Sequence, residues 1–215
     1  MKLVSIEITR VTSLFLSSRL EGQLYLPAAT ADFAQKYEFV EFPKTLEEMR
    51  KAKVEFRHGR FNNISIESVD LYNDGVVITS RASSNVLDEF LIDVLAYMSE
   101  RWHATFTKAF PIDRMYESTL TFHSDKDVLK LLAALNNISR SISNRLNATT
   151  GAAIDYYPFG IGLSADHAKI PSLKPIPFRI ERREGVDFGA NIYFSAAPLK
   201  TDDHIEILNE WERSV

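Results

Sequence analysis

Residues 64–97 read ISIESVDLYNDGVVITSRASSNVLDEFLIDVLAY, and this stretch decides the fold class. Apolar and polar residues alternate on both sides of Asn73-Asp74-Gly75, which is the period of a half-buried strand. Asp-Gly between two such runs predicts a β-hairpin, in which Gly75 supplies the positive φ that a tight turn requires. The sequence therefore predicts antiparallel strands at 64–72 and 76–80.

A helix is predicted directly after this hairpin. Ser83 or Ser84 can cap its start, and Asp88 and Glu89 lie close to its first turn. The apolar residues that follow recur at helical spacing and are Leu87, Phe90, Leu91, Val94, Leu95 and Met98. A stripe of this width predicts a helix that faces the core.

The same strand, turn, strand and helix order recurs near the C-terminus. Residues 178–211, FRIERREGVDFGANIYFSAAPLKTDDHIEILNEW, align with residues 64–97 without gaps at an offset of 114. The six identities are Ile66 with Ile180, Glu67 with Glu181, Gly75 with Gly189, Ile78 with Ile192, Ala82 with Ala196 and Asp88 with Asp202. Hairpin-plus-helix units share turn and cap residues in any case, so these matches leave both duplication and coincidence open.

The rest of the chain continues the mixed pattern. Val4, Ile6 and Ile8 alternate with polar residues and predict an opening strand, while Thr45 followed by Glu47 and Glu48 predicts a capped helix. Further strands are predicted at 22–27, 54–61, 118–122, 178–184 and 190–195, and further helices at 28–37 and from about residue 201. These elements indicate an α+β fold: a largely antiparallel sheet with helices packed on one face. The whole chain, 1–215, is predicted to form one domain, with a candidate repeat at 54–101 and 176–215.

Composition limits the functional classes. With 45% hydrophobic residues among 215, the chain can bury a substantial core. The net charge of −4 gives no bulk attraction to nucleic acid or anionic lipid, and the absence of cysteine excludes disulfides and thiolate chemistry. Polar residues interrupt the N-terminal apolar run too often for a signal peptide or membrane span. We therefore expect a cytoplasmic protein with no membrane partner.

A helix predicted at about 126–146 has the spacing of a helix–helix interface. Its apolar positions step by three, four, three and four residues, and they are Val128, Leu131, Leu135, Ile138 and Ile142. Only about two and a half heptads are present, so packing against the protein's own sheet is favoured over a dimer seam. The seam nevertheless remains the main candidate for an interface with a second protein chain.

Residues 154–168, IDYYPFGIGLSADHA, contain the candidate ligand-binding residues Tyr156, Tyr157, Phe159, Asp166 and His167. Alternation places an aromatic residue on each face of a strand here, one for the core and one for a partner or ligand. Gly160 and Gly162 lack the third glycine of a dinucleotide-binding motif, so a bulge or bend is favoured there. A surface turn capped by Asp166 is favoured over a catalytic role for the Asp-His pair.

A third group of residues combines cations with aromatic rings. Arg57, His58 and Arg60 lie between Phe56 and Phe61, a pattern typical of single-stranded nucleic-acid platforms. Arg182 and Arg183 are added to this candidate group. Two arginines in an otherwise acidic protein more often form salt bridges at a hairpin, so nucleic acid is not the favoured partner.

Catalytic signatures are missing from the sequence. It contains no His-x-x-x-His metal motif, no Gly-x-Ser-x-Gly elbow and no Walker loop, and no cofactor is expected. The acidic residues beside His123 and His204 are explained by helix starts. The sequence favours a non-enzymatic binding or assembly protein that acts through protein–protein contacts, and self-association is the expected form of that contact. The first alternative is an enzyme of unknown reaction, for which hydrolysis is one candidate, with Asp155, Asp166 or His167 in its site. The second alternative is a nucleic-acid accessory protein.

Overall fold

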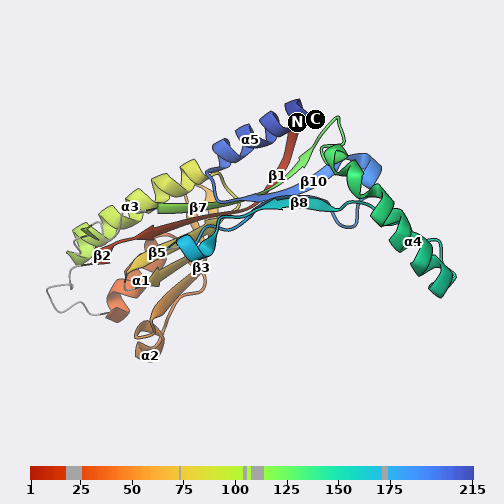
Figure 1. The fold of residues 1–215 in the computed structure, drawn as a ribbon. Coiled ribbons are helices and arrows are strands. Elements are labelled where there is room, and N and C mark those ends of the chain that lie inside the picture. The colour runs from red at the N-terminus through yellow and green to blue at the C-terminus, as the bar shows by residue number, and fades with distance from the viewer. Residues whose placement is uncertain (18–25, 73, 104–105, 108–113, 171–173) are drawn as a thin grey trace.

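The computed structural model describes residues 1–17, 26–72, 74–103, 106–107, 114–170 and 174–215. Its main feature is one antiparallel sheet in the order β3-β4-β5-β1-β7-β10-β9-β8 (Figure 1). The strands are β1 (Lys2–Leu14), β3 (Lys53–Phe61), β4 (Ile64–Tyr72), β5 (Gly75–Ser80), β7 (Arg114–His123), β8 (Gly160–Leu163), β9 (Phe178–Arg182) and β10 (Ile192–Ala197). A separate pair joins β2 (Leu16–Ser17) to β6 (Phe106–Thr107). The predicted α+β class is confirmed.

Helices α3 (Ser84–Trp102) and α5 (Thr201–Ser214) lie end to end along one face of the sheet (Figure 1). Helix α1 (Leu26–Lys36) packs beside α3, where Tyr37 donates a 2.7 Å hydrogen bond to Asp93. The short α2 (Leu46–Met49) starts with the predicted Thr45 cap, which forms a complete capping box with Glu48. Helix α4 (Asn136–Thr150) points away from the sheet instead. None of the helices in the described ranges has the length and apolar character needed to cross a bilayer.

The two halves of the sheet have the same topology. Elements β1, β3, β4, β5 and α3 follow one another in the first half, and β7, β8, β9, β10 and α5 do so in the second. The halves meet where β1 pairs with β7, and helices α3 and α5 meet at their N-termini. There the Ser84 amide donates to Thr201 Oγ1 (3.0 Å), and the Thr201 amide donates to Ser84 Oγ (2.9 Å). The contact is reciprocal, as expected at a local two-fold axis.

The register between the halves differs from the gapless alignment. Ser84 and Thr201 are separated by 117 residues, as are Ser80 and Ala197, which pair with Thr9 and Ser118 respectively. The separation in sequence is not constant through the unit because the two hairpins have connections of different length. Residues 183–191, which include a 3-10 turn, join β9 to β10, whereas only residues 73–74 join β4 to β5. The offset of 114 therefore does not describe the structural correspondence, and descent from one duplicated ancestor stays a prediction.

The core lies between the sheet and its helices in two clusters. Under α3 and α1, Phe33 packs against the rings of Tyr37 and Phe56 with centroids 4.9 and 4.7 Å apart. Under α5, the second cluster contains Leu120, Phe122, Val128, Leu129, Ile180, Tyr193 and Leu208. Burial of this apolar surface is the main stabilising contribution for both halves.

Two local predictions need correction. Gly75 does not adopt a positive φ; it is required because a Cβ atom there would lie 2.6 Å from the Ser13 carbonyl oxygen on β1. The predicted strand at 22–27 falls largely outside the described residues, and Leu26 and Pro27 belong to the start of α1. Proline is compatible with that position because the first turn of a helix leaves its backbone N–H groups unpaired.

Candidate interaction site

Residues 130–159 form an arm that projects beyond the edge of the sheet (Figure 1). The arm consists of the 3-10 helix η1 (Lys130–Leu135), α4 and an extended segment, 152–159, that runs back along α4. Gly151 ends α4 with a φ of 69°, the left-handed conformation that glycine adopts without strain, and this turn reverses the chain. The arm is thus a helix with a returning strand-like segment.

The arm begins at an anchored base. Val128 and Leu129 are buried in the second core cluster, and Trp211 of α5 donates a 2.9 Å hydrogen bond to the Val128 carbonyl. Asp127, just before them, accepts hydrogen bonds from the Leu129 amide (3.0 Å) and from the hydroxyl of Tyr193 (3.0 Å). These contacts fix the point where the arm leaves the body.

Arg182 of β9 joins the two ends of the arm. Its guanidinium donates to both carboxylate oxygens of Asp127 (2.9 and 3.0 Å) and to the carbonyl of Pro158 (3.3 Å), where the returning segment ends. The guanidinium also lies over the ring of Phe188 at 5.1 Å, and the side chain is only 11% exposed. Burial alone would raise the pKa of Asp127, but the hydrogen bonds from the Leu129 amide, Tyr193 and Arg182 outweigh it and lower the pKa. Arg182 is therefore a structural clamp.

One face of α4 is covered by the returning segment. Ser143 accepts a 2.8 Å hydrogen bond from the Tyr156 amide, and the side-chain oxygen of Asn147 accepts one of 2.8 Å from the Ile154 amide. These side chains satisfy backbone donors that would otherwise depend on solvent. The polar face of α4 thus holds the segment in place.

A different face of α4 carries an apolar stripe. It consists of Leu135, Ile138, Ile142 and Leu146. Leu135 is the last residue of η1 and the N-cap of α4, and the three residues within α4 fall within about 80° of one another at 100° per residue. The exposed fractions of the side chains are 43% for Leu135, 60% for Ile138 and 42% for Ile142, and Leu146 is half-buried. We call these four residues the α4 stripe. The expectation that this helix packs against its own sheet is therefore wrong for residues 135–146.

The predicted seam is only partly preserved in this stripe. Val128 is fully buried in the body, and Leu131 lies in η1, whose tighter winding of three residues per turn moves it away from the line through Leu135. Leu146 joins the stripe instead, although the heptad spacing did not include it. Assignment of the remaining residues to an interface stays a prediction.

The returning segment adds exposed aromatic side chains to the arm. Tyr156, Tyr157 and Phe159 are all exposed, and the ring of Tyr157 meets Phe188 edge-on at 6.0 Å. Within the described part of the chain, eight of the sixteen large exposed apolar side chains lie in the arm, 130–159. Such a concentration in one short region distinguishes the arm from the scattered exposure that is normal on protein surfaces.

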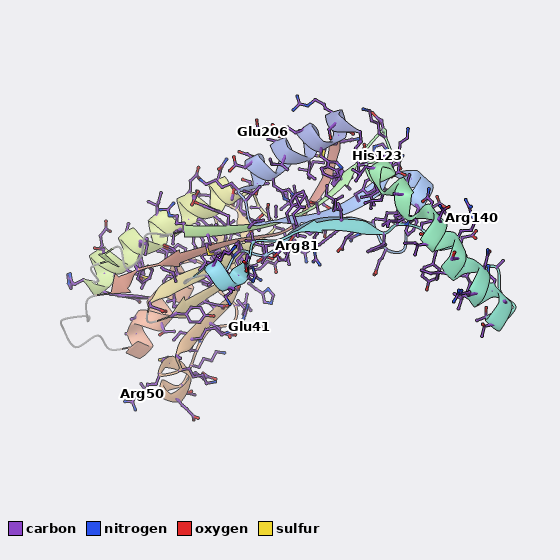
Figure 2. All side chains as sticks on the ribbon, viewed as in Figure 1. Glu41, Arg50, Arg81, His123, Arg140 and Glu206 are labelled. Atoms are coloured by element: carbon purple, nitrogen blue, oxygen red, sulfur yellow. The ribbon has the colours of Figure 1, made fainter. Side chains whose placement is uncertain are left out.

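The five candidate ligand residues are divided among three places, and Phe159 lines a hollow of its own next to Arg179 and Arg183. Tyr156 and Tyr157 line a shallow groove of about 340 Å³ against the polar face of α4. Arg140, whose position on α4 Figure 2 shows, lines the same groove. Asp166 instead caps the short 3-10 helix η2 (His167–Lys169) by accepting from the Ala168 amide (3.2 Å), and it pairs with Lys169. The ring of His167 hydrogen-bonds the Pro175 carbonyl through Nε2 (3.1 Å). The predicted Asp-His pair therefore serves local structure.

The candidate nucleic-acid residues lie toward opposite edges of the sheet. Arg57, His58 and Arg60 are on the edge strand β3, whereas Arg182 and Arg183 are in or next to β9. The arginines face carboxylates: Arg57 pairs with Glu55 at 2.8 Å, Arg60 with Glu38 at 4.0 Å, and Arg183 with Glu7 at 3.8 Å. The structure does not bring these five residues together into one basic patch.

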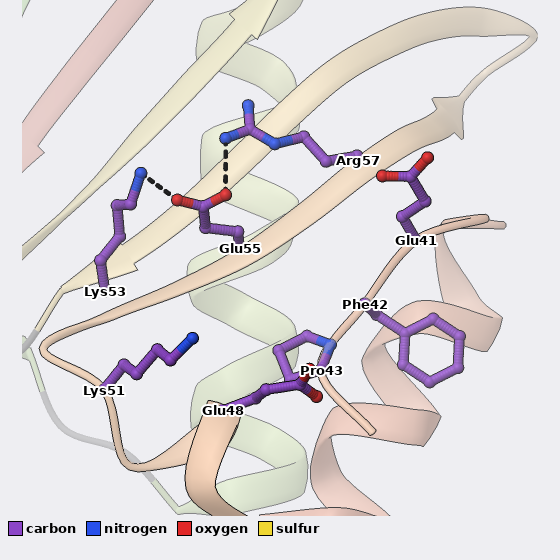
Figure 3. A pocket seen from close by; sticks show the side chains of 8 residues that line it. All are labelled: Glu41, Phe42, Pro43, Glu48, Lys51, Lys53, Glu55 and Arg57. Carbon is purple, nitrogen blue, oxygen red and sulfur yellow. Dashed lines mark hydrogen bonds and ion pairs between the residues drawn. The ribbon is translucent and has the colours of Figure 1, made fainter. Parts of the chain in front are cut away.

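A second hollow lies between β3 and the segment before α2 (Figure 3). It has a volume of about 420 Å³, and Glu41, Phe42, Lys51 and Arg57 are among the residues that line it. Its charged groups largely pair with one another, since Lys53 and Arg57 both bind Glu55. This pairing leaves little unbalanced charge for a ligand.

On the face of the sheet away from α3 and α5, Arg10 pairs with Glu117 at 2.7 Å, and Asp70 lies 3.6 Å from Arg57. Burial raises the pKa of Asp70, and its Oδ1 atom accepts no hydrogen bond. These arginines are therefore paired with carboxylates of the same face.

Sequence reasoning missed one buried polar cluster, in which His204 lies between two serines under α5. Ser195 donates to the Arg179 carbonyl (2.7 Å), so it accepts from His204 Nε2 (2.8 Å), and Ser118 donates to Nδ1 (2.7 Å). All three side chains are fully buried, which denies a substrate access to this serine–histidine contact. The useful sequence signal is the spacing of Thr201, His204 and Leu208 on one face of α5.

His204 is expected to make stability fall with acidification. Burial lowers its pKa from 6.5 to about 4, so the unfolded chain binds the additional proton between these values and is favoured there. Between pH 7 and pH 5, the free energy of unfolding should drop by about 2 kcal/mol, or roughly 4–8 °C in Tm. Thermal unfolding at both pH values measures this.

The matched variant for that prediction is His204→Leu. Leu87, 117 residues earlier, occupies the corresponding buried position on α3, so leucine suits this environment. The variant should lose stability at pH 7, because Ser118 no longer has its acceptor, but its decrease between pH 7 and pH 5 should be smaller than in the natural chain. An equal decrease in both proteins would refute the assignment.

Comparison with known proteins adds no family. No protein-family model matches the chain, and no curated protein matches it at a significant level. Within the described ranges, no three His, Asp or Glu side chains gather in a way that would hold a metal ion. The geometry of the arm is accordingly the basis for the functional interpretation.

Proposed function

We propose that this protein is a non-enzymatic assembly protein that associates with itself through its arm. The observation that carries the proposal is the exposure of Leu135, Ile138 and Ile142 in one line on a helix that is anchored at its base but projects into solvent. Exposed apolar surface of this extent is costly in water and is typical of interaction sites.

The anchoring also supports a binding role. Arg182 holds both ends of the arm, and the returning segment binds the polar face of α4 through Ser143 and Asn147. A partner would therefore meet a surface that is already ordered, which reduces the entropy lost on association. The apolar stripe is the part of α4 left available for that partner.

Native mass spectrometry and sedimentation velocity test the proposal on the natural chain. We expect a species of twice the 24.5 kDa chain mass that becomes more abundant as protein concentration rises. The interface is expected to be weak to moderate, so the series should extend to roughly 100 µM. A protein that remains monomeric over the whole series would contradict self-association.

A further inference from the structure

We infer that the partner of the arm is the α4 helix of a second copy, bound antiparallel through the α4 stripe. This inference rests on the proposed self-association and specifies its geometry. The first support is the spacing of the stripe itself, because Leu135, Ile138, Ile142 and Leu146 are arranged almost symmetrically about residues 140 and 141. A stripe with this symmetry can pack on its own antiparallel copy.

The register follows from that symmetry. With the two-fold axis near residues 140 and 141, Ile138 lies opposite Ile142 of the second copy, and Leu135 lies opposite Leu146. Every stripe residue then meets another apolar residue, giving four apolar layers. Arg140 points away from this contact, since it lies about 155° around α4 from the centre of the stripe at 100° per residue.

Charge selects the antiparallel orientation. Helix α4 contains Arg140 and Arg145 and no acidic residue. Arg145 borders the stripe, so a parallel pair would place the two Arg145 side chains next to each other without a compensating carboxylate. The antiparallel pair separates them along the helix axis by about 14 Å at 1.5 Å per residue. It also aligns the two helix dipoles favourably.

The position of α4 leaves room for such a pair. The returning segment binds the helix face that contains Ser143 and Asn147, about 115° around α4 from the stripe at 100° per residue. A second helix on the stripe therefore does not need to displace the segment. The two bodies would lie at opposite ends of the helix pair, because each arm extends away from its own sheet (Figure 1).

Disulfide formation can test the register directly, because the chain has no cysteine of its own. The variants Ile138→Cys and Ile142→Cys are mixed, with one of them labelled with ¹⁵N so that the mixed and self-paired disulfides differ in mass. Oxidation in a glutathione buffer is followed by mass spectrometry. A disulfide requires Cα atoms within about 7 Å, so the antiparallel register should give the mixed disulfide ~10-fold above either self-paired one. Ser141→Cys, on another face of α4, is the control for random collision.

Each other outcome overturns a distinct part of the inference. Self-paired disulfides at both 138 and 142 would show a parallel helix pair, which contradicts the orientation and leaves self-association intact. A dimer in sedimentation without any of these disulfides would place the contact elsewhere on the molecule. A monomer without disulfides would refute the proposed function together with this geometry.

Discussion

Replacement of both Leu135 and Ile138 by glutamate is expected to convert the self-associated protein to a monomer. Both side chains are exposed in the single chain, so the charges remain solvated there and should change the free energy of unfolding by no more than about 0.5 kcal/mol. In the dimer the same carboxylates would be buried without partners. A cost of about 3 kcal/mol corresponds to at least ~100-fold weaker association. Sedimentation velocity measures the change.

The matched control keeps the charge and moves it around the helix. Asn137→Glu with Asn144→Glu adds the same two negative charges to exposed positions of α4 that lie outside the stripe. This control should self-associate as the natural chain does, and circular dichroism should be unchanged for both double variants. If the stripe variant yields no soluble folded protein, Leu135 and Ile138 belong to the monomer core instead. If it associates normally, the stripe is not the interface.

The hairpins and helices were predictable because their signals are local. The strand at 64–72, the cap at Thr45 and the start of α5 at Thr201 each depend on residues within a few positions of one another. Periodicity and capping chemistry are determined at that range. The predicted chain order of strands and helices then led to the correct fold class.

The direction of the arm could not be predicted in the same way. The spacing of Leu135, Ile138 and Ile142 is the same whether the helix packs on its own sheet or on another chain. The choice depends on how η1 winds and on the contact between Arg182 and Asp127, which are 55 residues apart in the sequence. The candidate site was therefore visible as a pattern, whereas its exposure and the structural role of Arg182 required the fold.

The second large effect, a loss of stability, is expected when the Arg182 clamp is removed. Arg182→Ala should lower the free energy of unfolding by about 3 kcal/mol, or roughly 6–12 °C in Tm, because it removes a nearly buried guanidinium from Asp127 and from the Pro158 carbonyl. Thermal unfolding measures the loss. Hydrogen exchange should also become faster across 130–159, since both ends of the arm lose their contacts with the Arg182 side chain.

The neighbouring arginine provides the matched control. Arg183→Ala removes the same type of side chain, but Arg183 is 39% exposed and its ion pair with Glu7 is long, at 3.8 Å. Surface ion pairs of this kind contribute little, so this variant should lose less than about 0.5 kcal/mol. Arg182→Lys should fall between the two, because lysine keeps the charge, but its single ammonium cannot also replace the Nε and Nη1 groups with which Arg182 binds the carbonyls of Pro158 and Phe188. Equal losses for Arg182→Ala and Arg183→Ala would mean that Arg182 does not clamp the arm, and the case for an ordered interaction surface would lose its anchor.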